Sequence, residues 1–375
     1  MHIGAHIDFV GRYSMEDNDK PDEDTPEWEK MEEPYWGGYE TLNMEAAVIY
    51  LTGKLGDKVS YAIGEALVMP VYEGDSVTPV PGATLLDARI TWNITESIAL
   101  KMGRYIPATS MSVSPHRLSI HHLVDPPMMI KGSGYLLNLI PLPRFQTGVG
   151  ISVESGPTII SWDFFNGNEV LSPDSLSDVD RCKGGVFKVA VNGGGFHAGV
   201  YYLNEQSDSD DTINFEIMPG IPMEIKLNNN NVTQWGMELA YTSERIIAAF
   251  EYLDTVLDLR DTDVPDLKQM SYYFLAGAGL GPAQLVLRYE FAEAGYDEFL
   301  NDMAGGAVLG NVPDQQVNYT LGVNYSLNDN TTIALNYAWR HPELYEADFD
   351  WDGDTEDVDW PDINEASILV ELDLL

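Results

Sequence analysis

The chain has 375 residues, a formal net charge of −40, and a composition that is 44 % hydrophobic and 11 % aromatic. This acidity excludes a nucleic-acid binder, because neutralising phosphates requires clustered lysine and arginine, while the apolar content argues against a disordered acidic chain. The longest apolar stretch, 272–287, is interrupted by Gly279 and Pro282, so we expect no helix of the roughly 20 apolar residues that a bilayer requires.

The start of the chain has neither a basic segment nor an apolar segment of the kind found in secretory signals. Because the rest of the sequence has the character of a secreted protein, we expect a signal peptide that has been removed. A single cysteine, Cys182, excludes an intramolecular disulfide.

Alternation of apolar with small or polar residues predicts β-strands that have two different faces. In the stretch that ends at Trp339, for example, Ile333 and Leu335 alternate with Ala334 and Asn336. Read in chain order, this pattern predicts about sixteen strands at 2–12, 43–54, 58–69, 83–94, 97–105, 143–153, 157–166, 183–192, 196–204, 232–242, 245–254, 269–279, 283–293, 315–325, 331–340 and 364–375.

The connections between these strands alternate between short turns and long polar segments. The long ones are 13–42, 70–82, 106–142, 167–182, 205–231, 255–268, 295–314 and 341–363. Short periplasmic turns and long extracellular loops are typical of outer-membrane barrels. The sequence therefore predicts a single all-β domain over 1–375, a transmembrane antiparallel β-barrel surrounded by outer-membrane lipid and lipopolysaccharide.

The polar faces of the strands are too hydrophilic to face lipid, so we expect them to line a water-filled lumen. Charges of both signs along such a lumen favour the passage of hydrated solutes. The charged residues predicted to line the pore or its constriction from the strands are Arg89, Lys101, Arg104, Arg144, Asp163, Lys188, Glu238, Glu251, Arg288, Glu290 and Arg340.

Segment 106–142 differs from the other long connections because it is apolar and rich in proline. Exposed loops are rarely so hydrophobic, so we expect this segment to fold inward and narrow the pore. It would bring Arg117, Asp125 and Lys131 to the constriction. Its histidines lack a repeated ligand spacing, which argues against a metal site among them.

Short motifs around this segment resemble the phosphate-selective porin O and P family. They are Met102–Pro107, Leu123–Pro127, Pro143–Val149 and Phe164–Gly167. The resemblance implies a 16-stranded, trimeric channel whose third-loop region forms the eyelet. The family's ladder of loop arginines and lysines is reduced here to Arg117 and Lys131, so the resemblance supports a pore more than phosphate selectivity.

Acidic residues concentrate in two of the predicted outer loops. Segment 13–42 has eleven Asp and Glu against two Lys, and segment 341–363 has ten against none. A strongly negative mouth would concentrate cations and repel anions. The alternative is a solvated or salt-adapted surface without a role in selectivity.

One acidic run has the spacing of a calcium-binding loop, with oxygen ligands at positions 1, 3, 5, 7, 9 and 12 and Gly353 at position 6. The predicted calcium ligands are Asp348, Asp350, Asp352, Asp354, Glu356 and Asp359. Aspartate replaces the usual glutamate at position 12, and the alternative is a loop that is merely charged.

Together these features predict a passive diffusion channel for small hydrophilic solutes or ions, leaning to cations, that requires no cofactor. The alternative is a structural barrel that sheathes a partner such as a cytochrome or a lipoprotein. A barrel enzyme is disfavoured, because no serine lies in a nucleophile-elbow pattern such as GxSxG.

Overall fold

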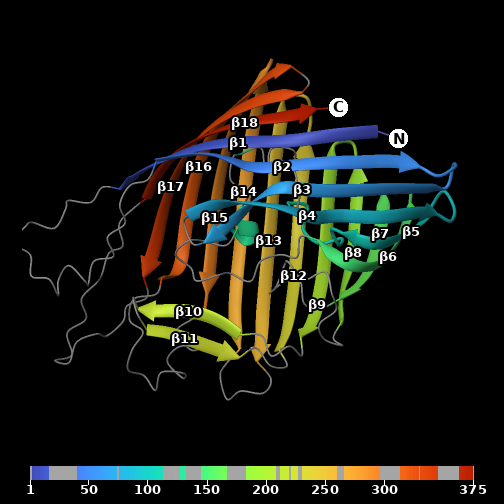
Figure 1. Cartoon of the computed structure of the whole chain (residues 1–375), viewed down its shortest axis with the longest axis horizontal. Helices are drawn as coiled ribbons and strands as arrows, with labels where there is room; N and C mark the ends of the chain where they lie inside the picture. The colour runs from blue at the N-terminus through green and yellow to red at the C-terminus, as the bar shows by residue number, and fades with distance from the viewer. Residues whose placement is uncertain are drawn as a thin grey trace, which may run out of the picture.

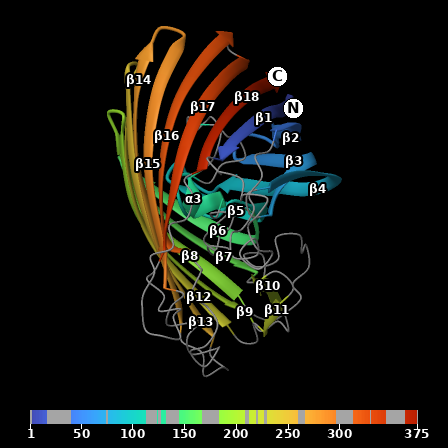
Figure 2. The same cartoon turned by 90° about the vertical axis from the view of Figure 1, so that its left-hand side faces the viewer.

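The computed structural model describes residues 2–16, 40–73, 76–112, 123, 127–131, 145–166, 183–207, 212–218, 221–226, 230–259, 266–295, 313–328, 330–344 and 363–374. Sixteen strands in this part of the chain form one closed antiparallel barrel (Figures 1 and 2). The predicted all-β barrel is therefore confirmed.

The barrel strands follow one another around the ring in chain order. They are β1 (His2–Glu16), β2 (Glu40–Lys54), β3 (Val59–Glu73), β4 (Ser76–Asn93), β5 (Ile98–Tyr105), β6 (Gln146–Ser155), β7 (Thr158–Asn166), β8 (Lys183–Gly193), β9 (Phe196–Ser207), β12 (Asn230–Thr242), β13 (Ile246–Leu259), β14 (Leu267–Leu280), β15 (Ala283–Ala294), β16 (Pro313–Asn328), β17 (Thr331–Leu344) and β18 (Ile363–Leu374).

The first and last strands close the ring. β1 pairs antiparallel with β18, with Ala5 opposite Leu374 and Glu16 opposite Ile363, so the two ends of the chain lie side by side (Figure 1). Closure leaves no unpaired strand edge, which a barrel in a bilayer requires because lipid offers no hydrogen-bond partners.

Side chains alternate between the two faces of the wall as the sequence pattern predicts. On β7, Trp162 and Phe164 are 49 % and 52 % exposed, whereas Asp163 between them is 1 % exposed. Exposed apolar residues with buried polar neighbours are the reverse of a soluble barrel. This arrangement places the apolar face outward and the polar face in the interior.

Two predicted long connections are wrong. Segment 70–82 is largely strand, because β3 and β4 continue past its prolines until Glu73 lies opposite Ser76. Segment 205–231 contains a hairpin, β10 (Thr212–Met218) paired with β11 (Ile221–Lys226), which is a sheet separate from the barrel and is drawn near the lower ends of the barrel strands in Figure 1. Apolar alternation on both sides of Pro219-Gly220 is the sequence signal for it.

The described part of the chain also contains one short helix, α3 (Met128–Lys131), between β5 and β6. Within the described residues, no helix has the length and apolarity needed to cross a membrane. Figure 2 shows α3 in front of the inner side of the barrel wall, and it contacts β14 and β15.

Candidate functional site

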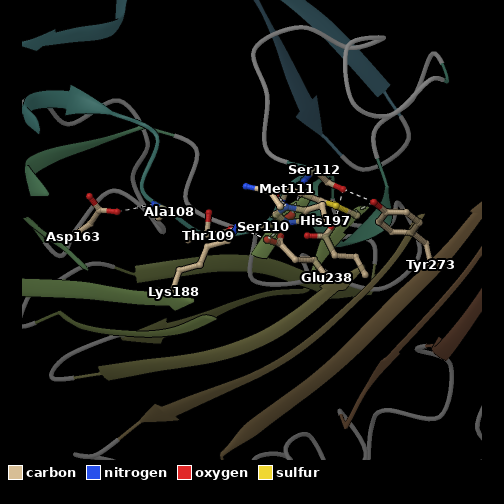
Figure 3. Close-up of polar contacts among 12 residues, drawn as sticks. Ala108, Thr109, Ser110, Met111, Ser112, Asp163, Lys188, His197, Glu238 and Tyr273 are labelled. Carbon is tan, nitrogen blue, oxygen red and sulfur yellow. Dashed lines mark hydrogen bonds and ion pairs between the residues drawn. The ribbon is translucent and has the colours of Figure 1, made fainter. Parts of the chain in front are cut away.

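The chain that leaves β5 lies against the inner face of the barrel, and its first anchor is Asp163 on β7. The Tyr105 hydroxyl donates to Asp163 Oδ1 (2.9 Å), and the Ala108 amide donates to Oδ2 (2.8 Å; Figure 3). Lys101 Nζ lies 3.7 Å from Oδ1 and 4.5 Å from the centre of the Tyr105 ring. The buried Asp163 carboxylate thus holds the chain after β5 against the inner face of the barrel.

Glu238 on β12 is the second anchor, and it is fully buried. Its Oε2 accepts the Met111 amide (2.7 Å), while its Oε1 contacts Lys188 Nζ (2.5 Å) and His197 Nε2 (2.6 Å). Lys188 Nζ also donates to the carbonyl of Thr109 (2.6 Å). The Glu238–Lys188 ion pair therefore binds both the Met111 amide and the Thr109 carbonyl of the segment after β5 (Figure 3).

Glu251 on β13 is the third anchor. Its Oε2 accepts hydrogen bonds from the hydroxyl of Ser112 and from the hydroxyl of Tyr273 on β14 (3.1 Å), and these two hydroxyls lie 2.6 Å apart. The Ser112 amide in turn donates to Ser110 Oγ (2.9 Å). Side-chain contacts here replace the ladder bonds that an irregular segment lacks.

The fourth anchor is Glu290 on β15, which holds the start of α3. Its Oε1 accepts the Met128 amide (2.7 Å), and Arg288 Nε lies 3.0 Å from its Oε2. Leu123 is fully buried, and a Cβ built at Gly322 on β16 would meet its side chain. The segment after β5 therefore contacts the wall from β7 to β16.

Register places three of these carboxylates in one row across neighbouring strands. Glu238 lies opposite Glu251, Glu251 opposite Tyr273, and Tyr273 opposite Glu290. Like charges directly opposite one another are unfavourable, and the contacts to Lys188, Ser112 and Tyr273 offset that cost. We call Asp163, Glu238, Glu251 and Glu290 the anchored wall.

Glycine makes room for two of the anchors. A Cβ at Gly150, opposite Asp163, would meet the Asp163 carboxylate and the Tyr105 hydroxyl. A Cβ at Gly199, opposite Glu238, would lie 2.5 Å from Glu238 Oε1 and 3.0 Å from its Cγ. Because neither position tolerates even a methyl group without movement, each carboxylate can lie flat along the wall.

Across the lumen from much of the anchored wall, β4 and β5 carry a second charged group, which we call the β4–β5 strip. It consists of Asp87, Arg89 and Lys101. Arg89 Nη1 lies 3.4 Å from Asp87 Oδ2, and the Arg89 side chain is 39 % exposed. The Lys101 side chain is 24 % exposed. Among the described lumen cations, Arg89 and Lys101 retain the most access to solvent.

Three other predicted lumen cations are buried. Arg340 Nη2 lies 3.2 Å from Glu365 Oε2 on β18, and Arg104 is 6 % exposed. Arg288 is nearly inaccessible beside Glu290. Burial distinguishes these residues from the cations of the β4–β5 strip, although the sequence pattern treats all of them alike.

Several predicted residues lie outside the described part of the chain. They are Arg117, Asp125, Arg144 and the calcium run Asp348, Asp350, Asp352, Asp354, Glu356 and Asp359; Lys131 ends α3, but its side chain is not described. Of segment 106–142, the described residues are 106–112, 123 and 127–131. Within the described ranges, no group of three or more His, Cys, Asp or Glu is arranged to hold a metal ion.

The sequence reasoning missed the uncharged partners at this site, Tyr105, Ser112 and Tyr273, and it gave His197 no part in it. A buried tyrosine or serine among polar lumen residues has no distinctive spacing. The sequence feature that could have indicated the site is Gly150 opposite Asp163 and Gly199 opposite Glu238. This feature can be recognised only when the strand register is known.

A sequence model of the family described as phosphate-selective porin O and P matches residues 144–358. No curated protein sequence matches the chain significantly.

Solved structures of outer-membrane proteins share the fold. In-vitro folded OmpT, an outer membrane protein of Vibrio cholerae, superposes with a TM-score of 0.62 at 10 % identity, covering 99 % of this chain and 96 % of that one. An anion-selective porin from Comamonas acidovorans gives 0.61 at 11 % identity, covering 100 % and 99 %. Salmonella typhi OmpF in complex with daunomycin gives 0.57 at 11 % identity, covering 99 % and 97 %.

Proposed function

Because the chain belongs to the phosphate-selective porin O and P family, we propose that this outer-membrane channel passes small hydrophilic solutes and ions passively, with a preference for cations. The segment after β5 forms the constriction, and the anchored wall fixes its position. Passive transport fits a lumen that is lined by wall charges and narrowed by one inward segment.

The observation that supports the cation preference is the pairing of charges on the described inner wall. Acid–base pairs join Arg89 to Asp87, Lys101 to Asp163, Lys188 to Glu238, Arg288 to Glu290 and Arg340 to Glu365. Paired charges of opposite sign have weak fields at a distance. Selectivity then depends on the acidic outer segments 13–42 and 341–363, whose field reaches about 8 Å at physiological salt.

Reversal potentials under a salt gradient in planar bilayers test this proposal. We expect the wild type to favour cations, and we expect that preference to fall when the ten Asp and Glu of 341–363 are exchanged for Asn and Gln. Raising the salt concentration should weaken the preference in the wild type, because exposed charges are screened. A strong anion preference in the wild type would overturn the cation assignment while leaving the channel intact.

Phosphate preference, which the family's description suggests, is the competing outcome. It would require a cluster of basic groups at the constriction, and segment 106–142 contains only Arg117 and Lys131. Adding phosphate to a channel that conducts in potassium chloride distinguishes the two. A phosphate-selective channel would lose current as phosphate occupies its site, whereas the proposed channel would keep its current, which is carried mainly by the cation.

We also propose that the chain forms a homotrimer whose remaining outer surface contacts lipid and lipopolysaccharide. The outward apolar residues, such as Trp162 and Phe164, fit a lipid environment, and a trimer form is described for Vibrio cholerae OmpT, whose fold is similar (TM-score 0.59). Light scattering corrected for bound detergent gives the subunit number. A monomer mass under mild extraction would contradict the trimer.

For the run 348–359 we propose calcium binding by the six acidic side chains at ligand positions. Calorimetric titration of calcium should give a heat signal that Asp348→Ala and Asp352→Ala abolish. Asp357→Ala is the matched control, because Asp357 lies within the run but at no ligand position. Equal heats for all four proteins would remove the site.

A further inference from the structure

The carboxylate of Glu251 has one oxygen that forms no hydrogen bond with a described group, and the Ser110 hydroxyl also lies near this carboxylate. Its Oε2 accepts the hydroxyls of Ser112 and Tyr273, whereas its Oε1 is buried without a hydrogen-bond partner. The side chain as a whole is fully buried. Burying an ionised carboxylate without a counter-charge is costly, so Oε1 requires a partner.

The basic groups nearby already contact the other carboxylate of the pair. Lys188 Nζ and His197 Nε2 both lie against Glu238 Oε1, at 2.5 and 2.6 Å, and Lys188 also donates to the Thr109 carbonyl. Glu251 faces Glu238 across the β12–β13 pair and receives only hydroxyl groups. Its negative charge has no direct counterpart among the described side chains.

A second buried oxygen lies on the same patch of the wall. The Tyr201 hydroxyl on β9 has no hydrogen-bond partner among the described residues, and Tyr201 is 3 % exposed. Its ring covers Gly236, where a Cβ would lie 2.6 Å from the hydroxyl. Gly236 is two residues before Glu238 and lies opposite Leu253, which is two residues after Glu251. The hydroxyl therefore lies on the part of the wall that carries both carboxylates, and it interacts electrostatically with each of them.

We propose that a small monovalent cation, represented by sodium, binds between Glu251 Oε1 and the Tyr201 hydroxyl, between the wall and residues 109–112. Hard cations take oxygen ligands, and one uncompensated carboxylate charge matches one positive charge. Buried water completes the coordination. Because Glu251 also holds Ser112, the bound cation stabilises the constriction segment against the wall.

The test measures stability rather than conduction, so its result is independent of the proposed ion preference. The barrel in detergent micelles is heated in sodium chloride and, at equal ionic strength, in tetramethylammonium chloride, whose methyl groups keep its charge away from oxygen ligands. We expect wild type to unfold roughly tenfold more slowly in sodium present at about ten times its dissociation constant, because the cation binds only the folded state.

Three variants show which residues cause the difference in unfolding rate between the two salts. Glu251→Gln keeps an acceptor oxygen for Ser112 and Tyr273 but removes the charge, so its two rates should be equal. Tyr201→Phe should reduce the difference between the salts. Glu290→Gln is the matched control, because Glu290 is an anchor on the same row whose charge Arg288 already compensates, and it should keep the wild-type ratio.

Sodium-23 NMR of the wild type provides a second readout that requires no variant to fold. Binding broadens the sodium resonance. The acidic outer segments also broaden it, and the linewidth measured with Glu251→Gln gives that contribution, which is subtracted from the wild-type linewidth. Equal unfolding rates of wild type in the two salts would overturn the proposal, as would a sodium effect that persists in Glu251→Gln. A carboxylic-acid infrared band that disappears in Glu251→Gln would show that a proton occupies this oxygen instead.

Discussion

The carboxylates of the anchored wall and the cations of the β4–β5 strip are charged groups inside the same barrel, but they differ in burial. On the wall, Glu238 and Glu251 are fully buried and bind the segment after β5 through its Met111 amide and Ser112 hydroxyl. On the strip, Arg89 is 39 % exposed and pairs with its own neighbour Asp87. The difference teaches that a charged residue inside a pore can set its shape or its electrostatic field, and that burial distinguishes the two roles.

Removing the Glu238 carboxylate should have the largest effect. In Glu238→Ala the Met111 amide loses its acceptor and Lys188 is left buried without its partner. Breaking a buried pair in this way costs about 3–5 kcal/mol. Chemical unfolding in detergent measures the loss, and a changed single-channel conductance should accompany it. Glu238→Gln retains an acceptor and should stay closer to wild type.

Filling the space opposite Glu238 should have a smaller effect of the same kind. In Gly199→Ala the new methyl group would meet the Glu238 carboxylate and push it away from Met111. Overpacking of this kind costs about 1–3 kcal/mol. Gly193→Ala is the control, because nothing lies within 4 Å of a Cβ there. Equal unfolding curves for the two variants would mean that Glu238 is free to move.

Removing one hydrogen bond to the Asp163 anchor should have a still smaller effect. Tyr105→Phe removes the hydroxyl that donates to Asp163, while the Ala108 amide and Lys101 remain. A single hydrogen bond of this kind contributes about 0.5–1.5 kcal/mol. The loss should appear as a lower unfolding midpoint with unchanged conductance. A large conductance change would show that this one bond positions the segment.

Neutralising the strip should barely affect stability. Asp87 is 7 % exposed, but its partner Arg89 is 39 % exposed. An ion pair with a solvent-exposed partner contributes about 0–1 kcal/mol, so Arg89→Gln should unfold nearly like wild type. The step size should also be kept, while the reversal potential moves slightly toward cations because one positive charge leaves the lumen. A stability loss like that of Glu238→Ala would remove the distinction between the two regions.

The barrel could be predicted from the sequence because the alternation of apolar and polar residues in each strand shows which side chains face outward and which face inward. Alternation such as Trp162-Asp163-Phe164 follows directly from a wall with lipid on one side and polar groups on the other. The prediction was wrong over 70–82, where Pro70 and Pro79 lie opposite one another in paired strands instead of in a loop. The β10–β11 hairpin was missed inside a connection taken to be wholly polar.

The site was only partly predictable. Charged residues on inward faces could be found one by one, and Asp163, Glu238, Glu251 and Glu290 were. Their role in holding the segment after β5 could not be predicted. A hydrogen bond from the backbone amide of Met111 or Met128 to a carboxylate requires no particular residue type at the donor position. Pairing partners 58 to 162 positions apart, such as Tyr105–Asp163 and Met128–Glu290, become visible only in the folded barrel.

Single-channel recording in planar bilayers, with wild type, Glu238→Ala and Arg89→Gln measured side by side, tests the central claim most directly. The account predicts discrete, reproducible steps for wild type, a different step size for Glu238→Ala, and the wild-type step size for Arg89→Gln. Absence of steps from the wild type would contradict the channel, and equal steps from wild type and Glu238→Ala would contradict the anchored constriction.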